Sequence, residues 1–423
     1  MTSAAPVPNP PNAPRLGLSR DGRLLFAARA ARMFGYGSVA VILVLYLARL
    51  GLDGAAIGLI LSLTLIGDTV ISLWLTTHAD RLGRRRVLII GALLMAAAGL
   101  IFAATSVFAL LLVAATIGVI SPSGNEVGPF LAVEQASLTE TIEDRRRTSV
   151  FAWYNLVGSI ATACGALGAG LAVGALRNAG VSDIAAYRIV IVGYGVIGLA
   201  IAAIVSRVSP AVEVAVPADT TVARRLGLHK SRNIVLGLAA LFSLDAFAGG
   251  LVMQSILAYW FHATYGVPEA LLGAIFFAAN LLAAASALAA AGIARRIGLI
   301  NTMVFTHLPS NVLLILVPLM PNLQLAILVL LARFSISQMD VPTRQSYTIA
   351  VVEPDERSAA AGVTGIARSI GAGLSANFAG IFVASPALAA LPFFIGGGLK
   401  IVYDIALWVA FKARPAPEER ARE

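Results

Sequence analysis

The sequence predicts an all-α membrane protein in which twelve transmembrane helices form two pseudo-symmetric six-helix bundles. Hydrophobic residues make up 58% of the 423 positions and charged residues only 13%, which leaves too few polar side chains to cover a water-soluble globule. Apolar runs of roughly 20 residues match helices that cross a bilayer, whereas a membrane barrel shows alternating segments of about 10 residues. Related motifs also recur in the two halves of the chain.

Twelve spans are predicted from the apolar runs and the charged or Pro/Gly-rich segments between them. In chain order they cover residues 30–50, 54–77, 87–105, 107–131, 149–174, 185–207, 233–261, 268–292, 299–319, 323–343, 358–384 and 388–411. Each must be helical, because unpaired backbone groups are too costly in hydrocarbon.

These spans divide the chain into five parts. The two bundles are expected over residues 30–208 and 233–412, and a cytoplasmic linker over 209–232 joins them. Cytoplasmic tails are expected over 1–29 and 413–423.

Basic residues concentrate in every second loop. The loops after spans 2, 4, 6, 8 and 10 carry Arg81, Arg84, Arg85 and Arg86; Arg145, Arg146 and Arg147; Arg224, Arg225, Lys230 and Arg232; Arg295 and Arg296; Arg344 and Arg357. Loops rich in Lys and Arg stay in the cytoplasm, so both termini are expected there. This pattern accounts for the net charge of +9 without a nucleic-acid partner. The Ala- and Arg-rich composition suggests the inner membrane of a bacterium.

Internal repetition indicates a duplicated chain. The loop Ala79–Gly83 is echoed by Ala294–Gly298, and Glu126 recurs as Asp340 at nearly the same sequence offset. Two parallel halves that face each other across a substrate path are a common plan of secondary transporters.

The run Asp80-Arg81-Leu82-Gly83-Arg84-Arg85-Arg86 lies between the second and third spans. Gly83 permits a tight reversal there, and the arginines favour the anionic cytoplasmic membrane surface. The run resembles the signature loop of the major facilitator superfamily. That resemblance covers Met33 to Lys412 and implies a rocker-switch carrier, monomeric by default, whose central cavity opens alternately to each side of the membrane.

The resemblance also implies a cytoplasmic latch between the bundles. Its expected members are Asp80, Arg81, Gly83 and Arg84 in the loop, Glu140 and Arg147 after the fourth span, and Arg357 after the tenth, with Glu126 and Asp340 towards the cytoplasmic ends of those two spans. The sequence departs from the drug and proton antiporters of the family, because the fifth span lacks their Gly-Pro element and the fourth lacks their arginine.

Several ionisable residues fall deep inside predicted spans, where their cost makes each a functional candidate. Asp68 has no partner nearby in the sequence, and Asp245 lies similarly deep in the seventh span. A lone carboxyl in a low-dielectric path can exchange a proton with either side of the membrane. Asp68 is therefore the first candidate for proton coupling, and Asp245 the second.

The other intramembrane polar residues have two interpretations each. Lys400 and Asp404 are spaced to pair on one helix face, and Arg333 and Arg368 could pair with Asp340 or Asp245. All four could instead bind cargo. Asn155 and Asn280 could line the cavity or hydrogen-bond between helices, which is the commoner outcome.

These observations favour proton-coupled transport of a small organic solute, with export ahead of import. Buried cations argue for an anionic or zwitterionic cargo, and buried Asp68 and Asp245 for protons or a cationic one. The alternative is a proton-coupled uptake symporter for a sugar, an organic acid or another metabolite.

Other classes lack their required residues. The four histidines are scattered and form no catalytic or metal-binding constellation with carboxylates, so neither an enzyme nor a metal site is expected. A phosphate-binding GxxxxGK[ST] loop is missing, which argues against an ATP-driven pump. No cofactor is expected. A transport-dead receptor or sensor with the same fold stays an alternative.

Overall fold

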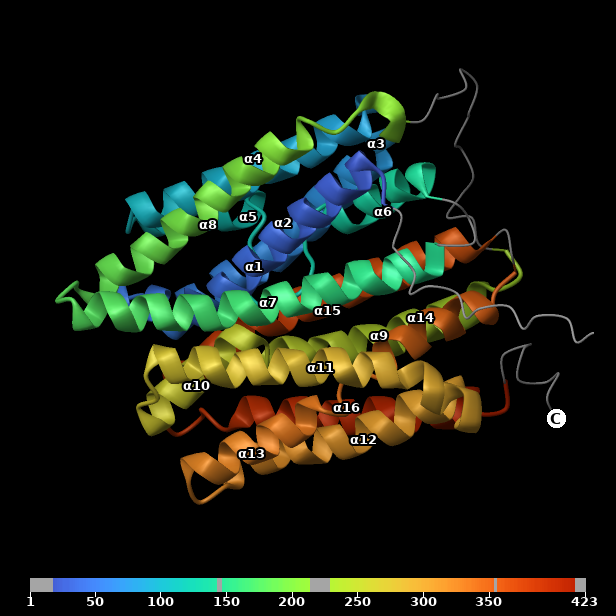
Figure 1. Ribbon diagram of the computed structural model, residues 1–423. Helices are drawn as coiled ribbons and strands as arrows, with labels where there is room; N and C mark the ends of the chain where they lie inside the picture. Colours follow the sequence, from blue (N-terminus) through green and yellow to red (C-terminus); the bar gives the residue numbers. More distant parts are fainter. Residues whose placement is uncertain (1–17, 143–146, 214–228, 354–355, 415–423) are drawn as a thin grey trace, which may run out of the picture.

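The computed structural model describes residues 18–142, 147–213, 229–353 and 356–414. The described residues are predominantly helical and contain no strand (Figure 1). Residues 1–17, 214–228 and 415–423, which make up most of the expected tails and linker, lie outside the described residues.

The N-terminal half contains the first six spans. Its helices are α1 (Arg20–Arg49), α2 (Gly54–Thr77), the short α3 (Ala79–Leu82), α4 (Arg84–Ala104), α5 (Phe108–Ile117), α6 (Phe130–Thr141), α7 (Arg147–Asn178) and α8 (Asp183–Val205). A 3-10 turn, η2 (Pro210–Val212), follows α8.

The C-terminal half repeats this plan. Its helices are α9 (Arg232–Leu251), α10 (Gln254–Tyr265), α11 (Glu269–Ile297), α12 (Leu299–Leu316), η3 (Val317–Leu319), α13 (Leu323–Phe334), α14 (Asp340–Ala350), α15 (Arg357–Ala384) and α16 (Leu391–Phe411).

The twelve-pass plan is confirmed over the described ranges. Nine segments there are long and apolar enough to cross a membrane. The pairs α5/α6 and α13/α14, together with α15, supply the other three passes. The first helix begins at Arg20, ten residues before the expected start at 30, and its first turn is capped by Ser19, whose hydroxyl accepts a hydrogen bond from the backbone N–H of Gly22 at 3.0 Å.

Three spans are broken near their middles. The fourth is interrupted between α5 and α6, the seventh between α9 and α10, and the tenth between α13 and α14. Gly124 and Gly128 in the first break have φ angles of 72° and 82°, which a residue with a Cβ atom rarely adopts. Irregular backbone at membrane depth is tolerated where protein or a polar path surrounds it.

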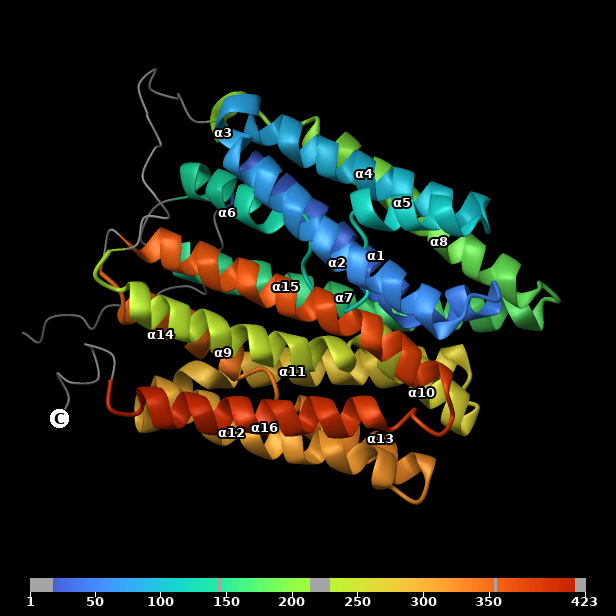
Figure 2. The same ribbon diagram turned by 180° about the vertical axis from the view of Figure 1, so that it is seen from behind.

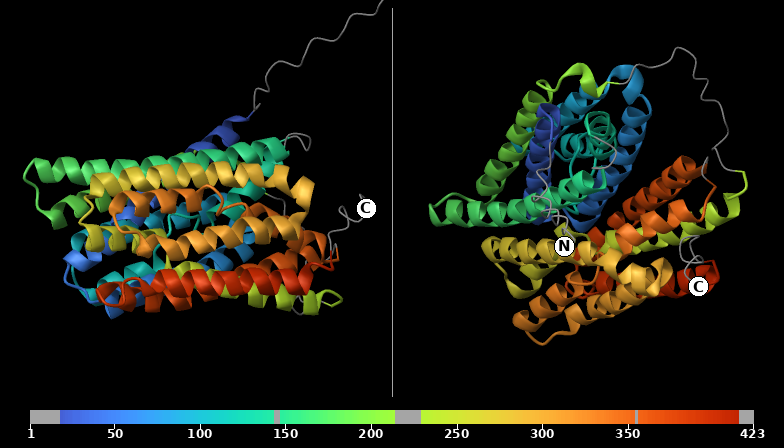
Figure 3. Two further views of the ribbon diagram at one scale, coloured as in Figure 1. Left: turned by 90° about the horizontal axis from the view of Figure 1, so that it is seen from below. Right: turned by 45° about the vertical axis from the view of Figure 1, so that its right-hand side comes forward.

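Both described ends of the chain lie on one side, which we call the terminal side; the other is the far side (Figure 3). The halves pack together towards the far side, through α2 against α15 (Figure 2) and α7 against α11. A Cβ atom on Gly58 would lie only 2.3 Å from the carbonyl oxygen of Asn377, and one on Gly170 would lie 2.3 Å from that of Glu269. The backbones of these helices therefore lie so close that no side chain larger than hydrogen fits at these two positions.

Towards the terminal side α2 and α15 diverge (Figure 2). A Cβ atom on Gly362 or Gly365, near the start of α15, would meet no atom within 4 Å. On the same helix, one on Gly380 would lie 2.3 Å from the carbonyl oxygen of Gly54. The structure is therefore an arrangement that is closed on the far side and open on the terminal side.

A backbone hydrogen bond joins the halves at mid-depth. The N–H of Ser255, just after the break of the seventh span, donates to the carbonyl oxygen of Pro122, in the break of the fourth, at 3.2 Å. The two irregular segments therefore meet where the halves begin to separate.

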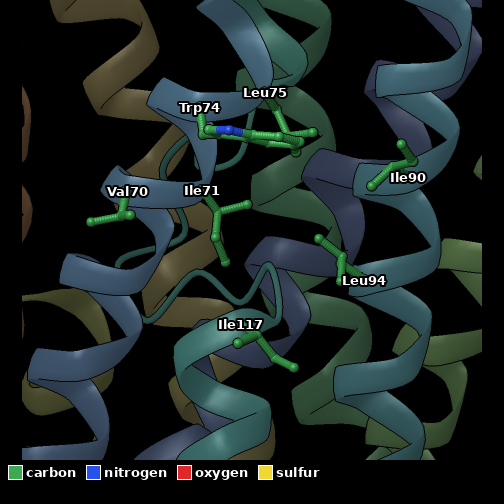
Figure 4. Close-up of a pocket in the computed structure, with 7 residues that line it drawn as sticks. All are labelled: Val70, Ile71, Trp74, Leu75, Ile90, Leu94 and Ile117. Carbon is green, nitrogen blue, oxygen red and sulfur yellow. The ribbon is translucent and has the colours of Figure 1, made fainter. Parts of the chain in front are cut away.

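An apolar recess of about 340 Å³ lies between α2, α4 and α5 (Figure 4). It is lined by Val70, Ile71, Trp74, Leu75, Ile90, Leu94 and Ile117. Trp74 and Val70 are more than half exposed, which suits a surface that faces lipid chains. Apart from the indole nitrogen of Trp74 its lining is apolar, so the candidate site for a polar cargo lies elsewhere.

Candidate functional site

Two arginines on α1 organise the polar interior of the N-terminal half. Arg29 and Arg32 are one turn apart and both bind Glu126, at 2.6 and 2.9 Å. Arg32 also makes a two-pronged contact with Glu134 at 2.6 and 2.8 Å, and Tyr154 donates to the same carboxylate. Such paired geometry is needed to hold buried charges.

Asp68 lies beside this network without joining it as an ion pair. Its carboxylate accepts hydrogen bonds from the backbone N–H of Gly128 at 2.7 Å and from the hydroxyl of Ser72 at 3.3 Å. Within the described residues it has no cationic partner. Because Gly128 follows Glu126 by two residues, Asp68 contacts the same irregular segment that the arginines hold.

Asp245 on α9 is the centre of the polar interior of the C-terminal half. It contacts Lys400 at 2.5 Å, and Arg344 and Arg368 at 3.3 Å each. His307 lies 4.0 Å away. The structure thus makes Asp245 a shared counter-ion of three cations.

The expected pair of Lys400 with Asp404 is wrong. Lys400 binds Asp245 instead, and Asp404 accepts from His307 at 2.9 Å and from Asn311 at 2.8 Å. Helical spacing permits a pair, but closer partners on other helices capture both side chains. Of the two arginines expected to pair with aspartates, Arg368 does so with Asp245.

Glu126 lies within a span break and Asp340 at the edge of one, whereas both were expected towards the cytoplasmic ends of their spans. Glu126 belongs to the segment between α5 and α6, and Asp340 begins α14. Each pairs inside its own half: Glu126 with Arg29 and Arg32, and Asp340 with Arg344 at 2.8 Å. Their repeat relationship therefore corresponds to equivalent places in two broken spans.

The two asparagines hydrogen-bond within their own halves. Asn155 on α7 accepts from Arg29 at 3.3 Å. Asn280 on α11 donates to the side-chain oxygen of Gln254 at 3.2 Å, and the amide nitrogen of Gln254 is buried without a partner.

The charged loop lies on the terminal side of the N-terminal half. Gly83 has a φ of 95°, and Glu213 accepts hydrogen bonds from the backbone N–H groups of Arg84 at 2.7 Å and Arg85 at 3.1 Å. The Arg84 side chain donates to Glu140 at 3.4 Å. These contacts stay within the half and its linker.

Other expected latch residues are less informative. Arg81 and Arg357 are exposed, and the side chains of Asp80 and Arg147 lie outside the described residues. The latch stays a prediction for a state in which the terminal side is closed.

A second carboxylate anchor was not anticipated from the sequence. Glu356 accepts from the backbone N–H groups of His229, Lys230 at 2.9 Å and Ser231 at 2.8 Å, just before α9. Burial acts to raise the pKa of Glu356, but hydrogen bonds from Ser231 and His229 outweigh it and lower the pKa to about 2. Glu356 thus fixes the start of the C-terminal half as Glu213 fixes the start of α4.

On the far side, Glu269 joins the halves. This buried carboxylate at the start of α11 contacts Arg177 of α7 at 2.6 Å and the hydroxyl of Tyr187 of α8 at 2.5 Å. Arg177 also binds Asp183 of its own half at 2.8 Å. Glu269 is therefore part of the closure on the far side.

The sequence did not identify three site residues: Arg29, Arg32 and Glu134. The expected limits of the first and fourth spans placed these residues at or beyond the span ends, where charged side chains are ordinary. The spacing of the two arginines, one turn apart before a long apolar run, was the available signal. His307 was set aside as an isolated histidine, since Asp245 and Asp404 are distant in the sequence.

Comparisons with known proteins agree with this architecture. The family model of the Major Facilitator Superfamily matches residues 25–376. The uncharacterized membrane protein YJR124C of Saccharomyces cerevisiae is 31% identical, over 93% of this chain and 94% of that protein.

Two solved transporters share the fold at low sequence identity. The nucleoside transporter NupG superposes with a TM-score of 0.73 at 14% identity, over 93% of this chain and 100% of that one. A D-xylose-proton symporter gives a TM-score of 0.69 at 14% identity, over 94% and 98% of the two chains. The chain belongs to the Major Facilitator Superfamily of membrane transporters.

Proposed function

We propose that this transporter couples the movement of a small organic solute to protons, and that Asp68 is the proton site. The observation that carries the proposal is the position of Asp68: its carboxylate has no cationic partner in the part of the chain that the structure describes, and it is bonded at 2.7 Å to the backbone of a broken span. A charged carboxylate accepts that hydrogen bond more strongly than a protonated one. Proton binding therefore weakens the hydrogen bond between α2 and the irregular segment that separates α5 from α6.

The break transmits this change to the ionic network. Glu126, two residues before Gly128, is the shared partner of Arg29 and Arg32 on α1. A shift of the break alters the angle at which Glu126 meets both guanidinium groups. Proton occupancy is in this way linked to how α1 packs against the centre of the molecule.

The proposed orientation places the terminal side in the cytoplasm of a bacterial inner membrane. Its support is the run of arginines at the start of α4 and the pair at the end of α11, both on the terminal side. A monomer suffices, because both halves of the path come from one chain. In this orientation the present arrangement admits cargo from the cytoplasm, which suits export.

Uptake by symport is the second candidate. It is supported by the fold shared with a D-xylose-proton symporter and a nucleoside transporter, both of which carry polar metabolites. Because one coupled cycle can run in either direction according to the gradients, flux must be measured separately in each.

The proposal is tested in two stages. Untargeted comparison of small molecules in cells with and without the protein identifies a cargo and whether it is depleted or accumulated. The purified protein in liposomes is then given that cargo with and without an imposed pH gradient. Proton coupling predicts that the gradient drives net movement and that a proton ionophore abolishes it; cargo flux indifferent to both would reject it.

A further inference from the structure

The tenth span contains a buried arginine without an ion pair. Arg333 lies in the last turn of α13 and is only 8% exposed. Its Nε is fully buried without a hydrogen-bond partner, and no ion pair of this guanidinium exists within residues 18–142, 147–213, 229–353 and 356–414. A guanidinium stays charged under all ordinary conditions, so a buried one needs an acceptor.

The nearby carboxylates are already engaged. The charges that act on Arg333 are those of Asp245 and Asp340, but Asp245 contacts three other cations and Asp340 contacts Arg344. Four cations therefore share this region with three carboxylates: Arg333, Arg344, Arg368 and Lys400 against Asp245, Asp340 and Asp404. These seven side chains leave one positive charge over.

A second unsatisfied donor follows one turn later. Ser337 lies in the break between α13 and α14, is 4% exposed, and its hydroxyl has no hydrogen-bond partner. The neighbouring Ser335 differs, because its hydroxyl donates to the carbonyl oxygen of Ala332 at 2.7 Å. Arg333 and Ser337 are thus two buried side chains with unsatisfied donors, four residues apart beside a span break, where transporter substrate sites commonly lie.

We propose that Arg333 and Ser337 bind an anionic group, a carboxylate or a phosphate, on the transported solute. A guanidinium matches the two oxygens of such a group, and a serine hydroxyl adds a third donor. Bound there, the anion neutralises the surplus charge of the C-terminal half. This inference rests on the proposed transport function and names the chemical class of its cargo.

The test measures binding, independently of flux. Full-length protein in nanodiscs of phosphatidylcholine, which lack anionic lipid headgroups, is heated with neutral and anionic probes of the same skeleton: glucose and glucuronate, adenosine and adenosine monophosphate, succinamide and succinate. We expect at least one anionic probe to raise the Tm while its neutral partner does not. Stabilisation by both members equally, or by no anionic probe, overturns the proposal.

Variants then test whether the stabilising probe binds at Arg333 and Ser337. Arg333→Gln should weaken binding of the stabilising probe by about tenfold or more, the range for a lost charged hydrogen bond, and Arg333→Lys should retain part of it. Ser337→Ala should weaken it several-fold, whereas Ser335→Ala, the same change at a satisfied hydroxyl, should not. Arg296→Gln, at the exposed end of α11, controls for the loss of one positive charge.

Unchanged affinity in Ser337→Ala and in a folded Arg333→Gln would show that Arg333 serves another purpose, such as pairing with Asp340 in a different state. If the anion binds at Arg333 but no pH gradient drives flux, the site stands and the proposed proton coupling falls. The two proposals can therefore fail separately.

Discussion

Asp68 and Gly128 are joined by a hydrogen bond of 2.7 Å between a side-chain carboxylate on α2 and a backbone N–H in the broken fourth span. The acceptor belongs to a carboxylate whose negative charge is lost when a proton binds. The donor is a main-chain N–H, which no side-chain substitution removes. Protonation of Asp68 is therefore the chemical change that weakens this bond.

Asp68→Asn should abolish gradient-driven flux while leaving exchange of cargo across the membrane largely intact. The amide keeps an oxygen for the Gly128 N–H but cannot take up a proton. Flux and counterflow in liposomes separate the two activities. Asp53→Asn, at the N-cap of the same helix, is the matched control. In the parent protein Asp53 accepts a hydrogen bond of 2.8 Å from the backbone N–H of Ala56, and asparagine can accept the same bond. Flux in Asp68→Asn with the pH dependence of the parent protein would refute the assignment.

Asp245→Asn should destabilise the protein strongly, because it leaves Lys400, Arg344 and Arg368 without their shared counter-ion. Removal of one partner from a buried ion pair costs about 3–5 kcal/mol. The double variant Asp245→Asn/Lys400→Met should recover part of that loss, since it also removes one stranded cation. Thermal unfolding of the three proteins in detergent checks this; a double variant less stable than the single one would contradict the shared counter-ion.

Glu269→Gln should open the far side more often, because it weakens the bond to Arg177 that joins the halves. The measurement is labelling of Ser62→Cys, at the contact of α2 with α15, in a Cys164→Ala background by a reagent that cannot cross membranes. Asp183→Asn is the control: it also removes a carboxylate from Arg177, but one in the same half. Equal labelling of both variants would exclude a gating role for Glu269.

Glu356→Gln should lower thermal stability at neutral pH, because the amide is a weaker acceptor for the N–H groups before α9. The pKa of Glu356 is depressed to about 2 in the folded protein, so its contribution is present above the unfolded value of about 4.3 and is lost as pH falls towards 2. The Tm difference from the parent should therefore shrink below about pH 4. Glu353→Gln, a half-exposed carboxylate 4.0 Å from Lys230, should change little at any pH.

The sequence was sufficient for the architecture because hydrophobic length and loop charge are local properties. The sequence also shows that Asp68 has no cation close to it along the chain, which made it a candidate for proton coupling. Contacts between helices could not be predicted in this way. The spacing of Lys400 and Asp404 suggested a pair, but Lys400 binds Asp245 on α9. Asp404 accepts hydrogen bonds from two residues of α12 instead. The assembled helices are also needed to see that Arg333 is the buried arginine with no ion pair among the described residues.

The bond from Ser255 to Pro122 has one further consequence for this transporter. Both of its atoms belong to the main chain, so substitution of the side chain at Ser255 leaves the donor and the acceptor in place. The two halves therefore keep this contact through any change of the surrounding side chains that preserves the backbone of the two breaks.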